Sequence, residues 1–208
     1  MKYETISFNT KRMFADSLKR AIEKKPLSKI TVSQLITDCG VNRKTFYYHF
    51  DDIYDLLKWM LEQEAIEVVK QMDLIFNYKE AVLFVMDYID NNDDMLKNIC
   101  HSLGRDELKR FFYTDFIDIM RSTIDKTEAM EKVILPPDFK DFLCQFYTEA
   151  IAGILLEYIV EPTKYDRDTT IRYFSVIIRT SVSSLLKKFA DAPLVPEASY
   201  PQQEKTYP

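Results

Sequence analysis

Two helix starts lie within twenty residues of each other, and they constrain the fold of this chain more than any other feature of the sequence. Thr31 is suited to an N-cap, and Gln34, three residues later, completes a capping box. Asn42 provides a second N-cap, and Gly40 between them can take the left-handed conformation that ends a helix. Residues 30–50 therefore predict a helix, a three-residue turn and a second helix, the geometry in which the second helix enters the DNA major groove.

The second predicted helix carries polar aromatic and cationic side chains beside the apolar Phe46 and Phe50. These side chains are Arg43, Lys44, Thr45, Tyr47, Tyr48 and His49. Arginine and lysine can donate to guanine O6 and N7, and threonine can reach a phosphate or a thymine methyl. Tyrosine and histidine can donate to phosphate oxygens. Two short helices around a glycine also occur in proteins that bind no DNA, but this side-chain cluster favours a DNA-binding helix.

The charge of the chain is unevenly distributed. Residues 1–50 contain ten Lys and Arg against four Asp and Glu, whereas the remaining residues contain 18 against 29. A basic head on an acidic body indicates an anionic partner for the head alone, and a solvated basic face is the alternative.

The rest of the sequence predicts an all-α protein. Three glycines in 208 residues leave little material for phosphate-binding loops or tight hairpins. Apolar residues recur at helical spacing in the first helix, along 53–72, in two or three helices over 78–128 and in two more at about 138–160 and 168–189. We expect a helix-turn-helix head over 1–52, a regulatory and dimerisation body over 53–190 and a flexible tail over 191–208.

Residues 10–57 resemble the N-terminal domain of the TetR family of bacterial transcriptional regulators. The matching segments are Thr31-Val32, Cys39-Gly40-Val41, the run from Thr45 to Phe50, and Leu56-Leu57. The resemblance implies a dimer of all-α subunits, each with a three-helix DNA-binding head and a ligand-binding and dimerisation body. The run from Arg43 to Phe50 is also similar to a subgroup of the family, the activators of dihydroxyacetone kinase operons.

The resemblance also assigns roles within the head. It implies that Tyr47, Tyr48 and His49 hold phosphates and that base readout falls mainly to Arg43, Lys44 and Thr45. We include Thr31, which opens the first helix of this pair, among the DNA-binding residues.

Aromatic residues of the body are candidates for an effector pocket, although aromatics at helical spacing more often fill a core. The family resemblance implies a cavity between the middle helices, where tyrosines would supply polar handles in an apolar pocket. The candidates are Tyr113, Phe116 and Tyr147.

The last two helices have broad apolar stripes, which predict a homodimer interface built from Gly153, Ile154, Ile178 and Val182. Glycine allows close helix approach, and a four-helix interface would place two heads on successive major grooves of a palindromic operator. Deep burial within one subunit would produce the same sequence pattern.

Few residues are available for other chemistry. The chain has two histidines, and Cys39, Cys100 and Cys144 lie far apart, which is typical of reduced thiols. We expect no catalytic site, metal, cofactor, leader or membrane span, and a cytoplasmic location. Two functions remain: a dimeric transcriptional regulator controlled by a small molecule or partner protein, and a helical adaptor that acts through protein contacts.

Overall fold

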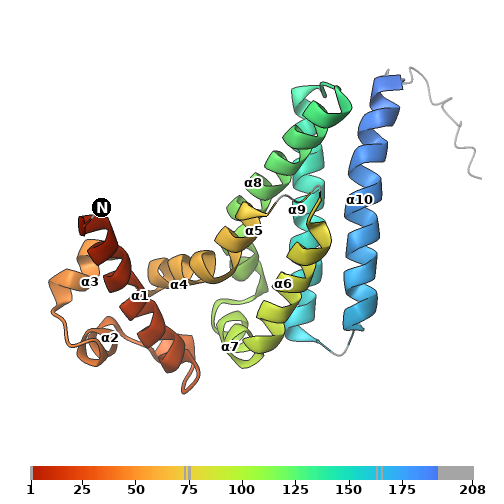
Figure 1. Cartoon of the computed structure of the whole chain (residues 1–208). Helices are drawn as coiled ribbons and strands as arrows, with labels where there is room; N and C mark the ends of the chain where they lie inside the picture. The colour runs from red at the N-terminus through yellow and green to blue at the C-terminus, as the bar shows by residue number, and fades with distance from the viewer. Residues whose placement is uncertain (1, 73, 75, 163, 165, 192–208) are drawn as a thin grey trace, which may run out of the picture.

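The computed structural model describes residues 2–72, 74, 76–162, 164 and 166–191, and every regular element in this part of the chain is helical (Figure 1). The all-α prediction is confirmed. The predicted tail lies, apart from Asp191, outside the described residues.

The head contains α1 (Lys2–Ile22), the 3-10 turn η1 (Leu27–Lys29), α2 (Val32–Asp38) and α3 (Arg43–His49). The linking segment contains α4 (Ile53–Leu61), the π-helix η2 (Glu62–Ile66) and α5 (Glu67–Gln71). The body contains α6 (Tyr78–Asn91), α7 (Asp93–Leu103), α8 (Arg105–Glu131), α9 (Pro137–Val160) and α10 (Arg167–Asp191).

Both predicted helix starts in the head are present. The Thr31 hydroxyl oxygen accepts from the Gln34 amide at 3.4 Å, and the Gln34 side-chain oxygen accepts from the Thr31 amide at 3.1 Å. The Asn42 side chain accepts from the Thr45 amide at 3.0 Å. Gly40 has a φ of 65°, which a residue with a Cβ rarely adopts. Local side-chain chemistry therefore sets both helix boundaries and the turn between them.

An aromatic core fixes α3 against α1. Phe14, Leu18 and Phe46 are fully buried, and the rings of Phe14 and Phe46 meet edge to face with centroids 5.2 Å apart. Phe50 is 3% exposed and packs at the end of the same cluster. Because one face of α3 is held by these rings, its opposite face is oriented outward.

The segment that joins head and body differs from the single longer helix that the apolar stripe over 53–72 predicts. The helical path changes to a π-helix over Glu62–Ile66 before it returns to α-helix in α5. A π turn holds more residues than an α turn, so it rotates the faces on either side relative to each other. Leu57 can thus pack into the core shared with the head, while Ile66 and Val69 line a cavity in the body.

The body is built around three long helices, and Figure 1 shows α4 reaching from the head to them. α9 packs along α8, and α6 packs along α10. The predicted breaks in the middle of the chain are confirmed, since α6 ends at Asn91 and Gly104, with φ of 84°, separates α7 from α8. Among the described helices, α9 alone is long and apolar enough, by length and composition, to cross a membrane, and 44% of its most apolar window is buried within the subunit.

Buried residues form two clusters. The larger one continues from Phe14 in α1 through Leu57 in α4 to Leu96 in α7 and Ile159 in α9. The smaller cluster joins the ends of α8, α9 and α10 around Ile124 and Leu186. The hydrophobic core therefore does not stop at residue 52 but continues from the head into the body.

Candidate nucleic-acid interface and body cavity

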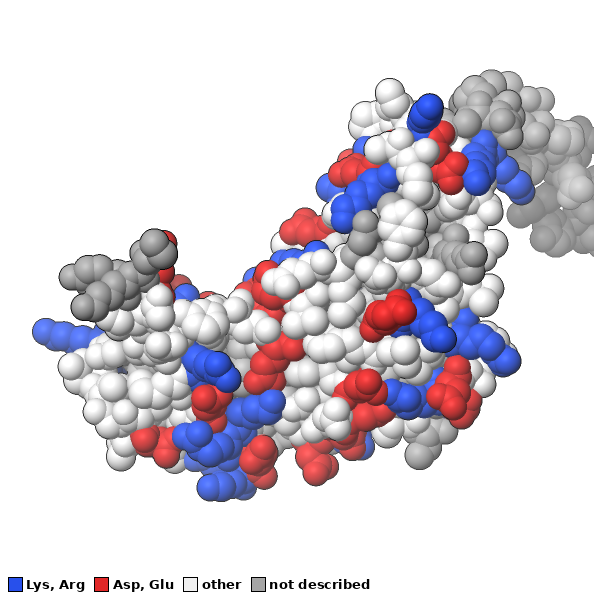
Figure 2. Space-filling model, viewed as in Figure 1, with Lys and Arg blue, Asp and Glu red and all other residues white. Residues whose placement is uncertain are grey.

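The outer face of α3 is polar and exposed. Tyr48 is 82% exposed and Tyr47 is 48% exposed, and Arg43 and Lys44 are also exposed. Figure 2 shows a basic side chain projecting from the outer edge of the head and a larger group of Lys and Arg along its lower edge. Arg43, Lys44, Tyr47 and Tyr48 of α3 are therefore accessible to solvent, while Thr45 and His49 are partly buried.

Two of these side chains, Arg43 and Tyr47, contact each other along α3. Arg43 Nη2 donates to the Tyr47 hydroxyl at 3.3 Å, and the guanidinium lies over the Tyr47 ring at 5.6 Å from the centroid. A guanidinium has five N–H donors, so this contact leaves donors for a guanine edge. The Thr45 hydroxyl donates to Asn42 Oδ1 at 3.2 Å, so Thr45 offers DNA an acceptor or a methyl group rather than a donor.

His49 lies where the C-terminal end of α3 meets α1. Its Nδ1 is 3.5 Å from the Ser7 hydroxyl oxygen. Partial burial and the nearby Lys11 ammonium lower the pKa of His49 below its usual 6.5, so the ring is predominantly neutral at pH 7. Lys11 itself lies over the rings of Phe50 and Trp59, at 5.4 and 5.6 Å. Sequence reasoning missed Ser7 and Lys11, because helical spacing within α1 does not show which residues adjoin α3.

Thr31 opens α2 rather than α3. It is exposed, and its oxygen is the acceptor in the capping box, which leaves the hydroxyl hydrogen available to an incoming oxygen. Its contribution to the surface is therefore a donor beside the first turn of α2.

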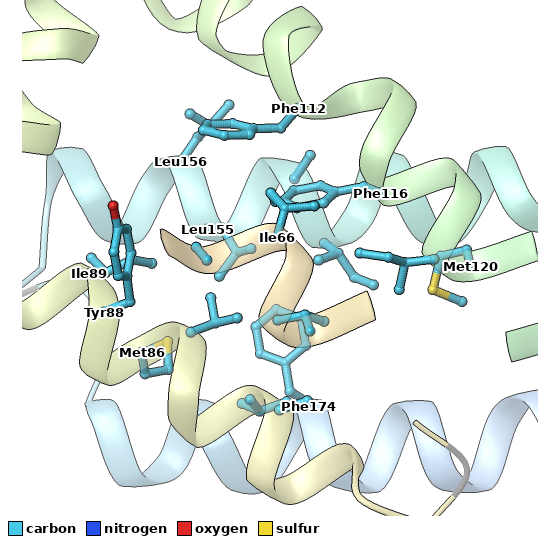
Figure 3. A pocket seen from close by; sticks show the side chains of 18 of the residues that line it. Ile66, Met86, Tyr88, Ile89, Phe112, Phe116, Met120, Leu155, Leu156 and Phe174 are labelled. Carbon is cyan, nitrogen blue, oxygen red and sulfur yellow. The ribbon is translucent and has the colours of Figure 1, made fainter. Parts of the chain in front are cut away.

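The body contains an apolar cavity of about 160 Å³ (Figure 3). Side chains converge on it from η2, α6, α8, α9 and α10, as the labelled Ile66, Met86, Phe116, Leu155 and Phe174 show. Among the described residues that line it, Phe116 was predicted from the sequence.

Tyr113 and Tyr147 are not among the described residues that line this cavity. Tyr147 is 4% exposed and belongs to the smaller core cluster, where its hydroxyl donates to the Ser181 hydroxyl at 2.7 Å and burial raises its pKa. Phe112 and Tyr88, which do line it, were not singled out as pocket residues. The 3.6-residue period identifies a helix face, but it does not show which faces leave a space between them.

Tyr88 connects the cavity to the head. Its hydroxyl donates to Glu64 Oε2 at 2.9 Å, and Lys19 Nζ in α1 donates to the same oxygen at 2.7 Å. We call these three residues the Lys19–Glu64–Tyr88 bridge. Burial and the neighbouring carboxylate raise the pKa of Tyr88, so the phenol stays protonated and remains a donor. Glu64 lies in the π-helix η2, and the bridge therefore crosses the segment that joins head and body.

A second polar contact between head and body lies at the same, C-terminal end of α1. Asn98 of α7 donates to the carbonyls of Ile22 and Lys25, at 2.8 and 3.0 Å, and accepts from the Leu27 amide at 3.2 Å. One amide side chain thus holds the end of α1 and the turn that follows it against the body.

The predicted dimer residues divide into two groups. Ile154 is 36% exposed, and a Cβ on Gly153 would meet no atom within 4 Å, so both positions border open space. Ile178 is half-buried and lines the cavity, and Val182 is 4% exposed in the smaller cluster, so both pack within one subunit. Among the side chains that the structure describes on α9 and α10, the large apolar ones that are exposed are Phe142, Phe146, Ile154, Tyr173, Val176, Ile177 and Leu185.

Three comparisons relate the chain to known proteins. Residues 77–180 match the TetR_C_8 family model, described as a transcriptional regulator C-terminal region. The chain is 21% identical over 161 residues to the HTH-type dhaKLM operon transcriptional activator DhaS of Lactococcus lactis subsp. lactis (strain IL1403), covering 77% of this chain and 85% of that protein. It also superposes on a solved structure of a dihydroxyacetone kinase operon activator DhaS with a TM-score of 0.63 and 19% identity, covering 86% of this chain and 97% of the other.

Proposed function

This chain belongs to the TetR family of transcriptional regulators, and from that premise we propose that it binds a palindromic operator as a homodimer under the control of an effector in its body. The family is one of DNA-binding regulators and not of enzymes. We assign DNA binding to residues 1–52, effector binding and dimerisation to residues 53–190, and a cytoplasmic location.

One observation carries the DNA-binding proposal. Phe46 and Phe50 are buried against α1, while Arg43, Lys44 and Tyr48 of the same short helix are exposed together. A helix that is anchored by aromatics on one face and presents cations and phenols on the other matches what a major groove and its phosphates require.

The test is selection of the preferred duplex from a random library, followed by fluorescence anisotropy at several salt concentrations. We expect an imperfect palindrome, and log affinity should fall with log salt by about 0.9 per phosphate neutralised. The alternative, a helical adaptor, needs no such duplex. Failure to enrich any sequence, together with binding that does not respond to salt, would favour the adaptor.

Exposed apolar side chains support the dimer proposal. Phe142, Phe146 and Ile154 recur along α9 at intervals of four and eight residues, which places them on one face, and Val176 and Ile177 are exposed on α10. Pairing these faces about a two-fold axis would form a four-helix interface with Gly153 at a close approach. Ile178 and Val182 would support this interface from inside the subunit.

The Lys19–Glu64–Tyr88 bridge supports the proposal that the effector acts on the head. An effector alters DNA affinity only if it binds the two conformations unequally, and a coupling of about 1–3 kcal/mol is typical. A ligand against the Tyr88 ring would shift the phenol relative to Glu64 and thereby the ion pair that holds Lys19 of α1.

The names of the two similar proteins provide a first target. One is named as a transcriptional activator of the dhaKLM operon and the other as a dihydroxyacetone kinase operon activator. We propose activation of such an operon as the first regulatory role to test, by measuring transcription from its promoter with and without the protein.

A further inference from the structure

The cavity wall is almost entirely hydrocarbon. Aliphatic, thioether and aromatic groups from α6, α8, α9 and α10 face it, including Met86, Phe112, Leu155 and Phe174 (Figure 3). A buried apolar cavity of about 150 Å³ stays dry and accepts a molecule the size of benzene. The volume of about 160 Å³ found here is of that size.

Most polar residues on the wall have their polar atoms engaged with the protein. The Thr123 hydroxyl donates to the Ile119 carbonyl at 2.8 Å, the Tyr88 hydroxyl donates to Glu64, and Lys109 pairs with Glu149. Within the described chain, Tyr78 is the remaining wall residue with a hydroxyl to offer. A ligand with several hydroxyls or a net charge would therefore lose its hydrogen bonds to water and recover few of them.

Two aromatic rings give one side of the cavity a preference for flat ligands. Phe112 and Phe116 lie four residues apart on α8, with centroids 5.9 Å apart and planes at 16°. Their π-faces and edges can take a ring in the offset or edge-to-face contacts that aromatic pairs favour.

We propose that this cavity binds a compact, uncharged and largely apolar ring compound, with no more than one hydrogen-bonding group, and excludes polyols and anions. The proposal rests on the proposed role of the body as the effector-binding part, and it specifies the chemical class that this site accepts.

The test measures binding to the full chain without DNA. Toluene, indole, glycerol and dihydroxyacetone are compared by calorimetry and by the thermal unfolding midpoint. We expect the two ring compounds to bind and to raise the midpoint, since a ligand that binds only the native state stabilises it. Glycerol and dihydroxyacetone should leave the midpoint unchanged. Binding of glycerol or dihydroxyacetone, or failure of both ring compounds to bind, overturns the proposal.

A matched pair of variants locates the site. Ile119→Phe adds volume to the cavity wall, and Ile134→Phe makes the same change at a position that is 91% exposed. The first should weaken toluene binding on the order of tenfold or more, and the second should not change it. Equal affinities of the two variants would show that the probe binds elsewhere.

A second pair addresses the case in which Ile119→Phe does not fold, as judged by circular dichroism. Phe116→Leu enlarges the cavity, and Phe76→Leu is its control at a site that is 69% exposed. Phe116→Leu should shift preference from toluene toward the larger naphthalene. An unchanged preference in a folded protein contradicts the proposed site.

Direct binding also separates this proposal from the proposed regulatory function. If the ring compounds bind but leave DNA affinity unchanged, the ligand class is right and the effector role fails. If the protein binds its duplex but none of the ring compounds, the regulator stands and the ligand class is wrong.

Discussion

The head and the body of this protein encode their functions in different ways. In the head, the capping box at Thr31, the N-cap Asn42 and Gly40 lie within twelve residues and determine how α3 is presented. In the body, the cavity is formed by side chains from segments that are more than 100 residues apart, such as Ile66 and Phe174. A local signal can thus specify a DNA-binding surface, whereas a pocket depends on how several helices pack together.

The head and the body are also more closely connected than two independent domains would be. The larger core cluster joins them, and the Lys19–Glu64–Tyr88 bridge and Asn98 add polar fastenings. Variants that act on the body alone, on the head alone and on the connection between them should therefore have separable effects.

The largest effect is expected from the body surface. Ile154→Glu places a carboxylate on the proposed dimer face, where pairing would bury it without a partner at a cost of several kcal/mol. Ile154 is 36% exposed in the subunit, so the subunit itself should keep its helical circular dichroism. Light scattering should show monomers, and operator affinity should fall about a hundredfold or more.

The matched control is Ile134→Glu, at a position that is 91% exposed in the turn after α8. It should remain dimeric with normal operator affinity. A dimeric Ile154→Glu protein with normal DNA binding would place the interface on another face of the body.

A smaller loss is expected from the head. Arg43→Ala or Lys44→Ala should cost about 1–3 kcal/mol of operator binding and relax preference at one base pair in each half-site. Tyr48→Phe should weaken binding to all duplexes alike, because a phosphate contact carries no base information. Anisotropy titrations against the selected operator and single-base variants distinguish the two patterns. A uniform loss for Arg43→Ala would reassign that residue to the phosphate backbone.

Loss of the Tyr88–Glu64 hydrogen bond, which connects the regions, should lower the coupling free energy between cavity-ligand binding and operator binding by about 1 kcal/mol. Tyr88→Phe removes the hydrogen bond to Glu64 but keeps the ring in the cavity wall, so a cavity ligand should still bind and should change operator affinity less. Tyr158→Phe is the control, because Tyr158 donates to Asp90 at 2.8 Å within the body. The measurement is operator affinity with and without indole for each variant. An unchanged response in Tyr88→Phe would exclude the bridge as the route of coupling.

The structure of the head could be predicted from the sequence more fully than that of the body, and the reason is physical. Caps and a glycine turn act between residues three or four apart, so their consequences can be derived from spacing. The proximity of Ser7 to His49 joins residues 42 apart and has no local signature. Likewise, the apolar period of α10 includes Ile178 and Val182, but it does not distinguish a face that covers a cavity from one that meets a partner. The π-helix was missed because an apolar stripe has similar spacing on either side of it.

The smallest effect concerns His49 and the pH dependence of DNA binding. Burial and Lys11 lower the pKa of His49 in the free protein, so the ring is mostly neutral at pH 7 and gains its proton below pH 6.5. A phosphate oxygen at this ring would favour the protonated form, so the DNA complex should take up protons as the pH falls from 7 to 5. Operator affinity should therefore rise over this range by about 0.5 kcal/mol, the lower end of the net contribution of one hydrogen bond. His49→Gln should abolish the rise, whereas His101→Gln, which changes the other histidine of the chain, on α7 in the body, should preserve it. If His49→Gln retains the full pH dependence, the titrating group is another one and protonation of His49 does not contribute to DNA binding.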